Sequence, residues 1–184
     1  MTRLATTLAL GISWSVAGGC QKTAPEKSAA STSDDAHADG ASPAPGINRA
    51  PSHGYGTDIV WRHLAEAQTE SKTAGKPMMV FVHASWCGRC KELRPVFDDP
   101  ALVAASSELL MVNLDHDKSK DARTTFAPDG SYVPRIMFFD PSGARIDDIV
   151  NPRSPQFPLY YSSGNKRELI AAMRRATESA APPP

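Results

Sequence analysis

Two cysteines three residues apart carry the clearest chemistry in this sequence. Cys87 and Cys90 come shortly after the apolar run 78–82. If a buried strand ends there, Cys87 opens a helix, where unpaired backbone N–H groups and the helix dipole favour an anion. Those groups stabilise the thiolate, which is the form of cysteine that attacks disulfides. We therefore predict a dithiol/disulfide redox site in which Cys87 attacks and Cys90, one turn later, resolves the mixed disulfide.

The same Cys-x-x-Cys spacing occurs in zinc sites, c-type haem sites and structural disulfides. Zinc requires two more ligands, and the sequence has neither a second cysteine pair nor histidines at ligand spacing. Haem attachment requires a histidine directly after the second cysteine, where this chain has Lys91. A structural disulfide that closes so short a loop gains little stability. The pattern therefore favours redox chemistry over a structural disulfide, with no metal and no cofactor.

The N-terminal residues resemble an export signal. Arg3 precedes an apolar stretch, residues 4–16, that is too short and too interrupted to span a membrane. The end of this stretch resembles a bacterial lipoprotein signal, in which cleavage leaves Cys20 as a lipid-modified N-terminus. Because Ala17 stands where such signals usually have leucine, simple cleavage with Cys20 free or paired otherwise stays an alternative. We expect a signal peptide over 1–19 and a lipid on Cys20.

Composition divides the rest of the chain into a linker, one domain and a tail. Residues 20–51 hold almost no large apolar side chains, so they cannot offset chain entropy by burial, and we predict a disordered tether. Residues 52–179 have the length of a single domain, and 180–184 form a proline-rich tail predicted to be disordered. A formal net charge of +0 and the lack of a basic stripe give no case for nucleic acid.

Hydrophobic patterning predicts alternating helices and strands in this domain. We expect helices over 59–74, 88–97 with a kink at Pro95, 99–107 and 166–178, and strands over 76–83, 108–114, 135–140 and 144–150. The last two strands read as a hairpin. Near-continuous apolar strands predict a sheet that is covered on both faces, which is typical of an α/β domain.

This order of elements, with the cysteine pair after the first buried strand, resembles the thioredoxin fold: one α/β domain with a central mixed sheet flanked by helices. The sequence is more similar still to the small thioredoxin-domain proteins of the endoplasmic reticulum, the anterior-gradient group. The resemblance covers residues 54–177 and rests on segments 76–80, 85–90, 111–114, 131–138 and 140–143. Catalytically active members of that group keep both cysteines, and others keep one and act in protein interaction. This chain keeps both.

The resemblance implies further site residues. In this family the peptide bond that corresponds to Val133–Pro134 is cis, faces the cysteine pair and binds the extended backbone of a substrate. The resemblance therefore implies substrate-binding roles for Val133 and Pro134, although the sequence alone would favour a trans proline at a strand entry or edge. It also implies that Trp86 packs beside the disulfide and contacts substrate.

The sequence departs from the family pattern at two places. Many thioredoxins carry a buried acid and a lysine near the disulfide, where this chain has Phe81 and Met111. Proton transfer is therefore expected to use water or Glu92. The C-terminus lacks an endoplasmic-reticulum retention signal. With a lipid on Cys20, this favours a bacterial cell envelope, anchored to a membrane and facing the oxidising periplasm or exterior, or else simple secretion.

Two functional hypotheses follow. The first is a thiol–disulfide oxidoreductase that reduces, forms or isomerises disulfides in envelope or secreted proteins. Its partners would be protein thiols and disulfides, an unidentified electron donor or acceptor, and the membrane. The second is an interaction or chaperone module in which the disulfide is mainly structural. Among the other polar residues, we expect His83 to be a hydrogen-bonded core histidine, 115–118 a solvated loop, and 151–163 a loop bordering the substrate groove.

Overall fold

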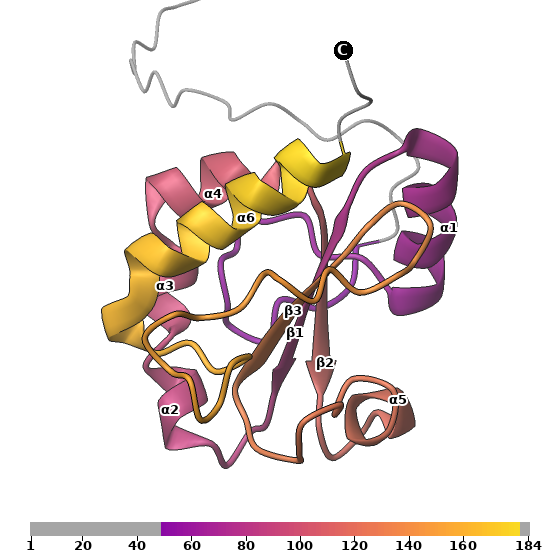
Figure 1. The fold of residues 1–184 in the computed structure, drawn as a ribbon. Helices are drawn as coiled ribbons and strands as arrows, with labels where there is room; N and C mark the ends of the chain where they lie inside the picture. The colour runs from indigo at the N-terminus through magenta and orange to yellow at the C-terminus, as the bar shows by residue number, and fades with distance from the viewer. Residues whose placement is uncertain (1–48, 181–184) are drawn as a thin grey trace, which may run out of the picture. The chain divides into compact units, whose positions relative to one another are not determined.

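The computed structural model describes residues 49–180 of the 184-residue chain. The predicted signal peptide, Cys20, most of the predicted tether and nearly all of the predicted tail lie outside these residues. Within the described part, a three-stranded sheet has helices on both of its faces (Figure 1). The predicted single α/β domain with a mixed, covered sheet is confirmed.

The central strand of the sheet is the apolar run that precedes the cysteines. The strand order is β2-β1-β3, with β1 at Met78–His83, β2 at Leu110–Asp115 and β3 at Arg135–Phe139. Strand β1 runs parallel to β2 and antiparallel to β3. All six residues of β1 are buried, as expected of a strand that is covered on both faces.

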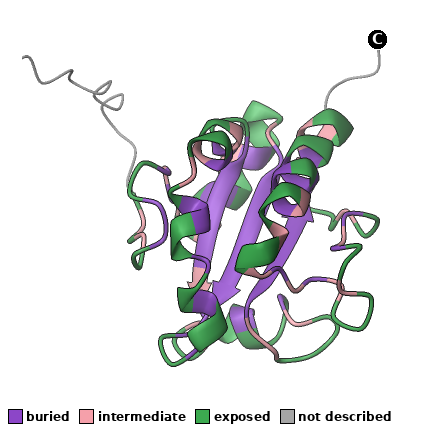
Figure 2. Cartoon of the chain, turned by 90° about the vertical axis from the view of Figure 1, so that its left-hand side faces the viewer, coloured by how far each residue is buried: buried purple, intermediate pink, exposed green. Residues whose placement is uncertain are grey.

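Successive side chains of β1 pack into two different clusters, one on each face of the sheet. Met79 and Phe81 belong to the cluster formed with α3 (Arg94–Phe97), α4 (Pro100–Ser106) and α6 (Lys166–Ala180). Met78, Val80 and Val82 belong to the cluster formed with α1 (Leu64–Ala74) and α5 (Lys120–Arg123). The remaining elements are α2 (Gly88–Lys91) and the 3-10 turn η1 (Ser163–Asn165). Figure 2 shows the buried strands between helices whose outer sides are exposed.

Several helix ends follow directly from their residues. Gly75 ends α1 with a φ of 65°, a left-handed conformation that glycine adopts without strain. The side chain of Asp99 accepts a hydrogen bond from the backbone N–H of Ala101 at 3.0 Å, and Pro100 takes the first helical position of α4. These predicted signals are confirmed.

The first helix starts later than predicted, at Leu64 rather than at residue 59. Instead of entering the helix, the backbone N–H of Arg62 bonds to the carbonyl of Met111 at 2.8 Å, and the carbonyl of Trp61 accepts from Ala50 at 3.0 Å. The buried indole of Trp61 donates to the carbonyl of Tyr55 at 2.7 Å. Residues 49–62 therefore wrap the edge of the sheet, and the ordered chain includes residues 49–51, which the sequence assigned to the tether.

Two other predictions need correction. The helix predicted over 88–97 is broken into α2 and α3, because Pro95 has no N–H to continue the helical hydrogen bonds. The second hairpin strand, predicted over 144–150, shrinks to a single bridge between Phe139 and Arg145. Nearer the start of β3, the N–H of Ile136 bonds to the carbonyl of Leu159 at 2.8 Å. A later loop therefore takes the place of the predicted strand there.

Candidate active site

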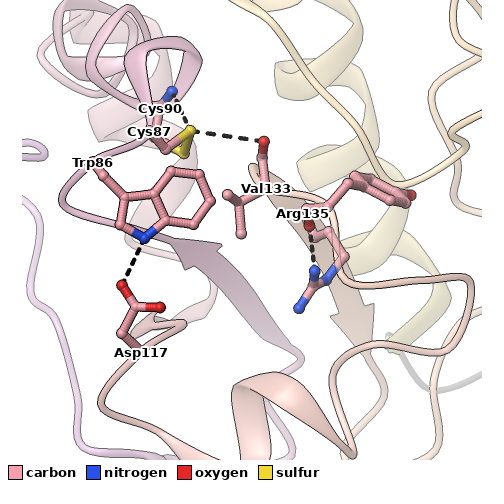
Figure 3. Close-up of a disulfide and its surroundings, with 7 residues drawn as sticks. Trp86, Cys87, Cys90, Asp117, Val133 and Arg135 are labelled. Carbon is pink, nitrogen blue, oxygen red and sulfur yellow. Dashed lines mark hydrogen bonds between the residues drawn. A yellow bond between two sulfur atoms is a disulfide. The ribbon is translucent and has the colours of Figure 1, made fainter.

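The cysteine pair lies where the central strand gives way to a helix. After β1 the chain turns, with the N–H of Cys87 bonding to the carbonyl of Ala84 at 3.2 Å, and Cys87 becomes the residue that caps α2. Cys90 lies one turn later, with the two Cα atoms 5.3 Å apart, and a disulfide joins the side chains (Figure 3). The fold thus forms the dithiol/disulfide arrangement that the spacing predicted.

The two sulfur atoms have different surroundings. Cys87 is 5% exposed and Cys90 is fully buried, so an incoming group meets Cys87 first. The backbone N–H of Cys90 donates to Sγ of Cys87 at 3.0 Å. In the reduced protein this bond would favour a thiolate on Cys87, since a hydrogen bond to the charged form lowers the pKa of an acid.

The loop that contains Pro134 faces the pair from the other side. The Val133–Pro134 peptide bond is cis, which is the geometry that the resemblance implied. The carbonyl oxygen of Val133 lies 3.7 Å from Sγ of Cys87 (Figure 3). The structure therefore brings Cys87, Cys90, Val133 and Pro134 together, and the substrate-binding roles of the last two stay predictions.

Trp86 stands at the rim of this site. Its side chain is 63% exposed, and its indole N–H donates to the carboxylate of Asp117 at 2.7 Å (Figure 3). The segment 115–118 was predicted to be a solvated loop. Residues 116–118 do form a turn in which Asp117 and Lys118 are exposed, whereas Asp115 is buried at the end of β2. Asp117 fixes the orientation of the tryptophan. This role of Asp117 was missed because it depends on a partner 31 positions away in the sequence.

A pair of aromatic side chains lies beside the loop that contains Val133. The rings of Tyr132 and Phe157 pack edge to face with centroids 5.0 Å apart, and Phe157 is 44% exposed. The hydroxyl of Tyr132 accepts from the backbone N–H of Leu159 at 3.3 Å. The predicted loop 151–163 therefore contacts the residue next to Val133, which fits its expected place at the groove.

Apolar residues surround the positions where many thioredoxins hold a proton relay. Phe81 and Met111 are both buried, and the ring of Phe81 packs against Tyr55 and Phe97 with centroids 4.8 and 4.9 Å away. Glu92, the other predicted proton carrier, pairs with Arg89 at 3.1 Å on the exposed surface. Neither Phe81 nor Met111 carries a proton acceptor, and the expected use of water or Glu92 stays a prediction.

His83 is a core residue, as predicted, but its expected hydrogen bond is not formed at Nε2. The side chain is 3% exposed, and Nε2 has no partner within residues 49–180. Burial lowers the pKa of His83 to about 4. The imidazole is therefore neutral at physiological pH.

Sequence reasoning also missed Arg135, which directly follows Pro134. It is 0% exposed, although it carries a guanidinium, and its donors reach backbone carbonyls on three segments. A charged residue inside an otherwise apolar strand was the available signal, because arginine is almost never fully buried without a specific partner.

Residues 49–180 contain neither a cluster of metal-ligating side chains nor a helix that could span a membrane. Between residues 49 and 180, no group of three or more histidine, cysteine, aspartate or glutamate side chains is placed to hold a metal ion. In the same part of the chain, no helix has both the length and the apolar character needed to cross a membrane.

Comparisons with known proteins agree with this geometry. A family model described as thioredoxin-like matches residues 60–141. Anterior gradient protein 3 of Xenopus tropicalis is 40% identical over 132 residues, which are 64% of this chain and 79% of that protein. An anterior gradient protein 2 homolog of Homo sapiens is 32% identical over 135 residues, covering 72% and 74% of the two chains. A thioredoxin structure from Thermus thermophilus superposes with a TM-score of 0.52 at 19% identity, covering 68% of this chain and 92% of that one.

A mixed sheet with a Cys-x-x-Cys disulfide at the end of its central strand defines a thioredoxin-like oxidoreductase fold. At the identities just given, the chain belongs to the thioredoxin-like family, in the group of the anterior gradient proteins.

Proposed function

We propose that this protein is a thiol–disulfide oxidoreductase that acts on other proteins through Cys87 and Cys90. The observation that carries the proposal is the unequal burial of the pair, with Cys87 toward solvent and facing the carbonyl of Val133, and Cys90 enclosed behind it. A structural disulfide gains nothing from such an arrangement, whereas exchange requires one sulfur within reach and one held back. In this proposal Val133 and Pro134 align the substrate, and Trp86 contacts it.

The reaction is a pair of disulfide exchanges. The thiolate of Cys87 attacks one sulfur of a substrate disulfide, forms a mixed disulfide and releases the other substrate sulfur as a thiolate. The thiolate of Cys90 then attacks Sγ of Cys87, closes the Cys87–Cys90 disulfide and releases the second substrate thiolate. Two electrons pass to the substrate, and a thiol donor must return them to the domain. Run in reverse, the same steps oxidise a substrate dithiol and require a disulfide acceptor.

The alternative is a client-binding module with a mainly structural disulfide, and the exposed rings of Trp86 and Phe157 favour it. The reduction potential of the pair separates the two functions. We expect a value between about −270 and −120 mV, the range of exchange proteins. It would be measured by equilibrating the protein in glutathione or dithiothreitol buffers and alkylating the free thiols. A potential below about −300 mV would instead identify a structural bridge.

We further propose that the protein is anchored in a bacterial envelope by a lipid on Cys20. The support is the lipoprotein-like sequence that ends at this residue. Cys20→Ser should move the protein from the detergent phase to the aqueous phase in a phase-partition assay, because the same residue accepts the lipid and directs cleavage. Cys90→Ser serves as the matched control and should stay in the detergent phase. Intact-mass analysis that finds no acyl groups on Cys20 would favour secretion.

A further inference from the structure

Arg135 makes an unusual set of contacts behind the Val133 loop. Its Nε donates to the carbonyl of Phe126 at 2.9 Å, its Nη2 to the carbonyl of Ala122 at 2.6 Å, and its Nη1 to the carbonyl of Tyr132. The guanidinium also lies over the ring of Tyr132, 5.8 Å from the centroid. Within residues 49–180 it forms no ion pair with a carboxylate.

A buried charge whose hydrogen bonds all go to backbone carbonyls, with no carboxylate paired to it, is a poor way to stabilise a fold. Burial lowers the pKa of Arg135, yet a guanidinium stays protonated in proteins, so the full desolvation cost remains. Apolar side chains of similar volume stabilise most cores at least as well. We therefore look for a role of this charge beyond packing. The hydrogen bond from Arg135 to the carbonyl of Tyr132 indicates what that role is.

The carbonyl of Tyr132 and the N–H of Val133 belong to the same peptide group. A hydrogen bond from a charged donor to that carbonyl fixes the peptide plane and polarises the amide, which makes the N–H a stronger donor. The N–H of Val133 has no partner in the described chain, and the residue is only half-buried. Its own carbonyl lies 3.7 Å from Sγ of Cys87. The residue whose carbonyl lies beside the attacking sulfur thus also carries an unused, polarised donor.

We propose that Arg135 is a positioning residue, which holds the Tyr132–Val133 peptide so that the N–H of Val133 donates to a backbone carbonyl beside the substrate's reacting sulfur. This inference rests on the proposed exchange function and on the expected binding of substrate backbone at Val133, and it adds Arg135 to that site as a positioning residue. The site should prefer disulfides in an extended polypeptide over small disulfides that have no backbone carbonyl to offer.

The test compares two substrates in the full-length protein. One is a short extended peptide with a disulfide to a chromogenic thiol, and the other is the same disulfide without the peptide. Arg135→Met should raise KM for the peptide about tenfold, the effect of one hydrogen bond, with little change in kcat, and Arg135→Lys, which keeps a charged donor, should raise it less. The rate with the small disulfide should stay within about twofold of wild type, since it does not use the Val133 N–H. A merely structural role would slow both substrates alike.

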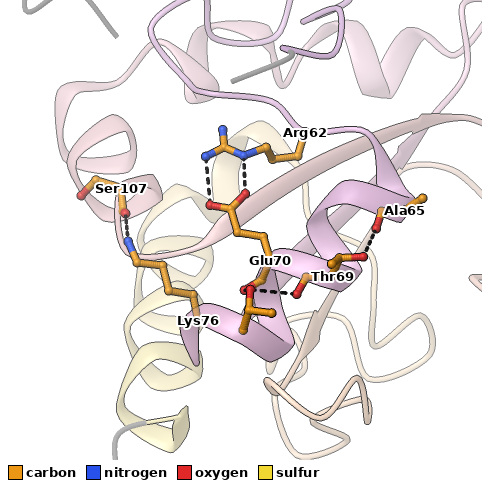
Figure 4. Close-up of polar contacts among 7 residues, drawn as sticks. Arg62, Ala65, Thr69, Glu70, Lys76 and Ser107 are labelled. Atoms are coloured by element: carbon orange, nitrogen blue, oxygen red, sulfur yellow. Dashed lines mark hydrogen bonds and ion pairs between the residues drawn. The ribbon is translucent and has the colours of Figure 1, made fainter. Parts of the chain in front are cut away.

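Arg62 provides the matched control because it is another arginine held by a defined partner. Its guanidinium binds Glu70 through two bonds of 2.8 and 3.3 Å (Figure 4). The backbone of Arg62 bonds to Met111, which pairs with Met79 near the start of β1, whereas the disulfide follows the end of that strand. Arg62→Met should lower stability but keep the wild-type ratio of peptide to small-disulfide rates. If Arg135→Met also keeps that ratio while wild type exchanges peptides, the role of Arg135 is refuted and the proposed function stands. If wild type exchanges neither substrate, the proposed function fails and this inference fails with it.

A second measurement uses the native arginine, in case the Arg135 variants do not fold. In Cys90→Ser protein labelled with ¹⁵N, a mixed disulfide between Cys87 and the peptide should shift the amide proton of Val133 downfield and slow its exchange with solvent. The reference is the adduct with 2-mercaptoethanol, which has no carbonyl. An identical Val133 amide in the two adducts would overturn the proposal.

Discussion

Replacing Cys87 with serine should lower disulfide exchange by more than about a thousandfold, because a hydroxyl replaces the sulfur of the Cys87–Cys90 pair that an incoming substrate meets first. Cys90→Ser should behave differently. Its Cys87 is still able to attack, but nothing resolves the product, so mixed disulfides with substrate proteins should accumulate. The difference follows from the structure, in which Cys87 is 5% exposed and Cys90 is fully buried.

Both variants are best compared in a Cys20→Ser background, which removes the third cysteine and leaves the sequence of residues 49–180 otherwise unchanged. Insulin reduction gives the rate, and non-reducing gels give the adducts. The Cys20→Ser protein itself should exchange at the wild-type rate. Exchange that survives in Cys87→Ser, or adducts that resist dithiothreitol in Cys90→Ser, would contradict the assignment of the attacking residue.

Acidification should destabilise the domain through His83. Its pKa in the fold is about 4, against 6.5 for an unperturbed histidine, so between these values the unfolded chain binds a proton that the folded domain does not. Stability is therefore complete above pH 6.5 and is lost as the pH falls toward 4. At 1.36 kcal/mol per unit, the loss between pH 7.5 and pH 4 is about 3 kcal/mol from this residue.

The surroundings of His83 determine this sign. Burial among the rings of Phe81, Tyr55 and His53 disfavours the imidazolium, and the positive charges of Arg94 and Lys118 act in the same direction. Asp115 opposes them but does not compensate. Protonation of His83 is therefore less favourable in the folded domain than in the unfolded chain.

Urea unfolding at several pH values would measure the effect. His83→Phe and His83→Gln replace the imidazole by neutral side chains of different shape, and each should lose about 3 kcal/mol less than wild type between pH 7.5 and pH 4. Differences between variants cancel the contributions of the other titrating groups. Equal losses in wild type and in both variants would show that His83 does not titrate as described.

Much of the fold could be predicted from the sequence because its signals are local. The apolar run before Cys87 predicted a central strand, Gly75 and Asp99 predicted helix ends, and Pro95 predicted a disturbed helix. Each signal acts within a turn or two of its own position, through backbone geometry or a short-range hydrogen bond. The pairing of Cys87 with Cys90 is local in the same sense.

The errors lie where long-range contacts compete with local patterning. Residues 59–63 look helical, but bonds from this segment to Met111 and Ala50 hold it along the sheet edge. The second hairpin strand failed because Leu159, far along the chain, bonds to β3. Propensity differences of well under 1 kcal/mol per residue are readily overridden by such contacts.

By itself, the sequence determined the class of domain and the pair of cysteines that forms the disulfide, since both depend on spacing and on apolar runs. Only the tertiary structure decided how those cysteines are surrounded. It set Cys87 outside Cys90, oriented Trp86 through Asp117, and placed the guanidinium of Arg135 against the carbonyl of Tyr132. These relations join residues that several segments bring together. Around Cys90 and Arg135, burial strengthens the electrostatic interactions and hydrogen bonds, because both are stronger in low-dielectric surroundings than in water.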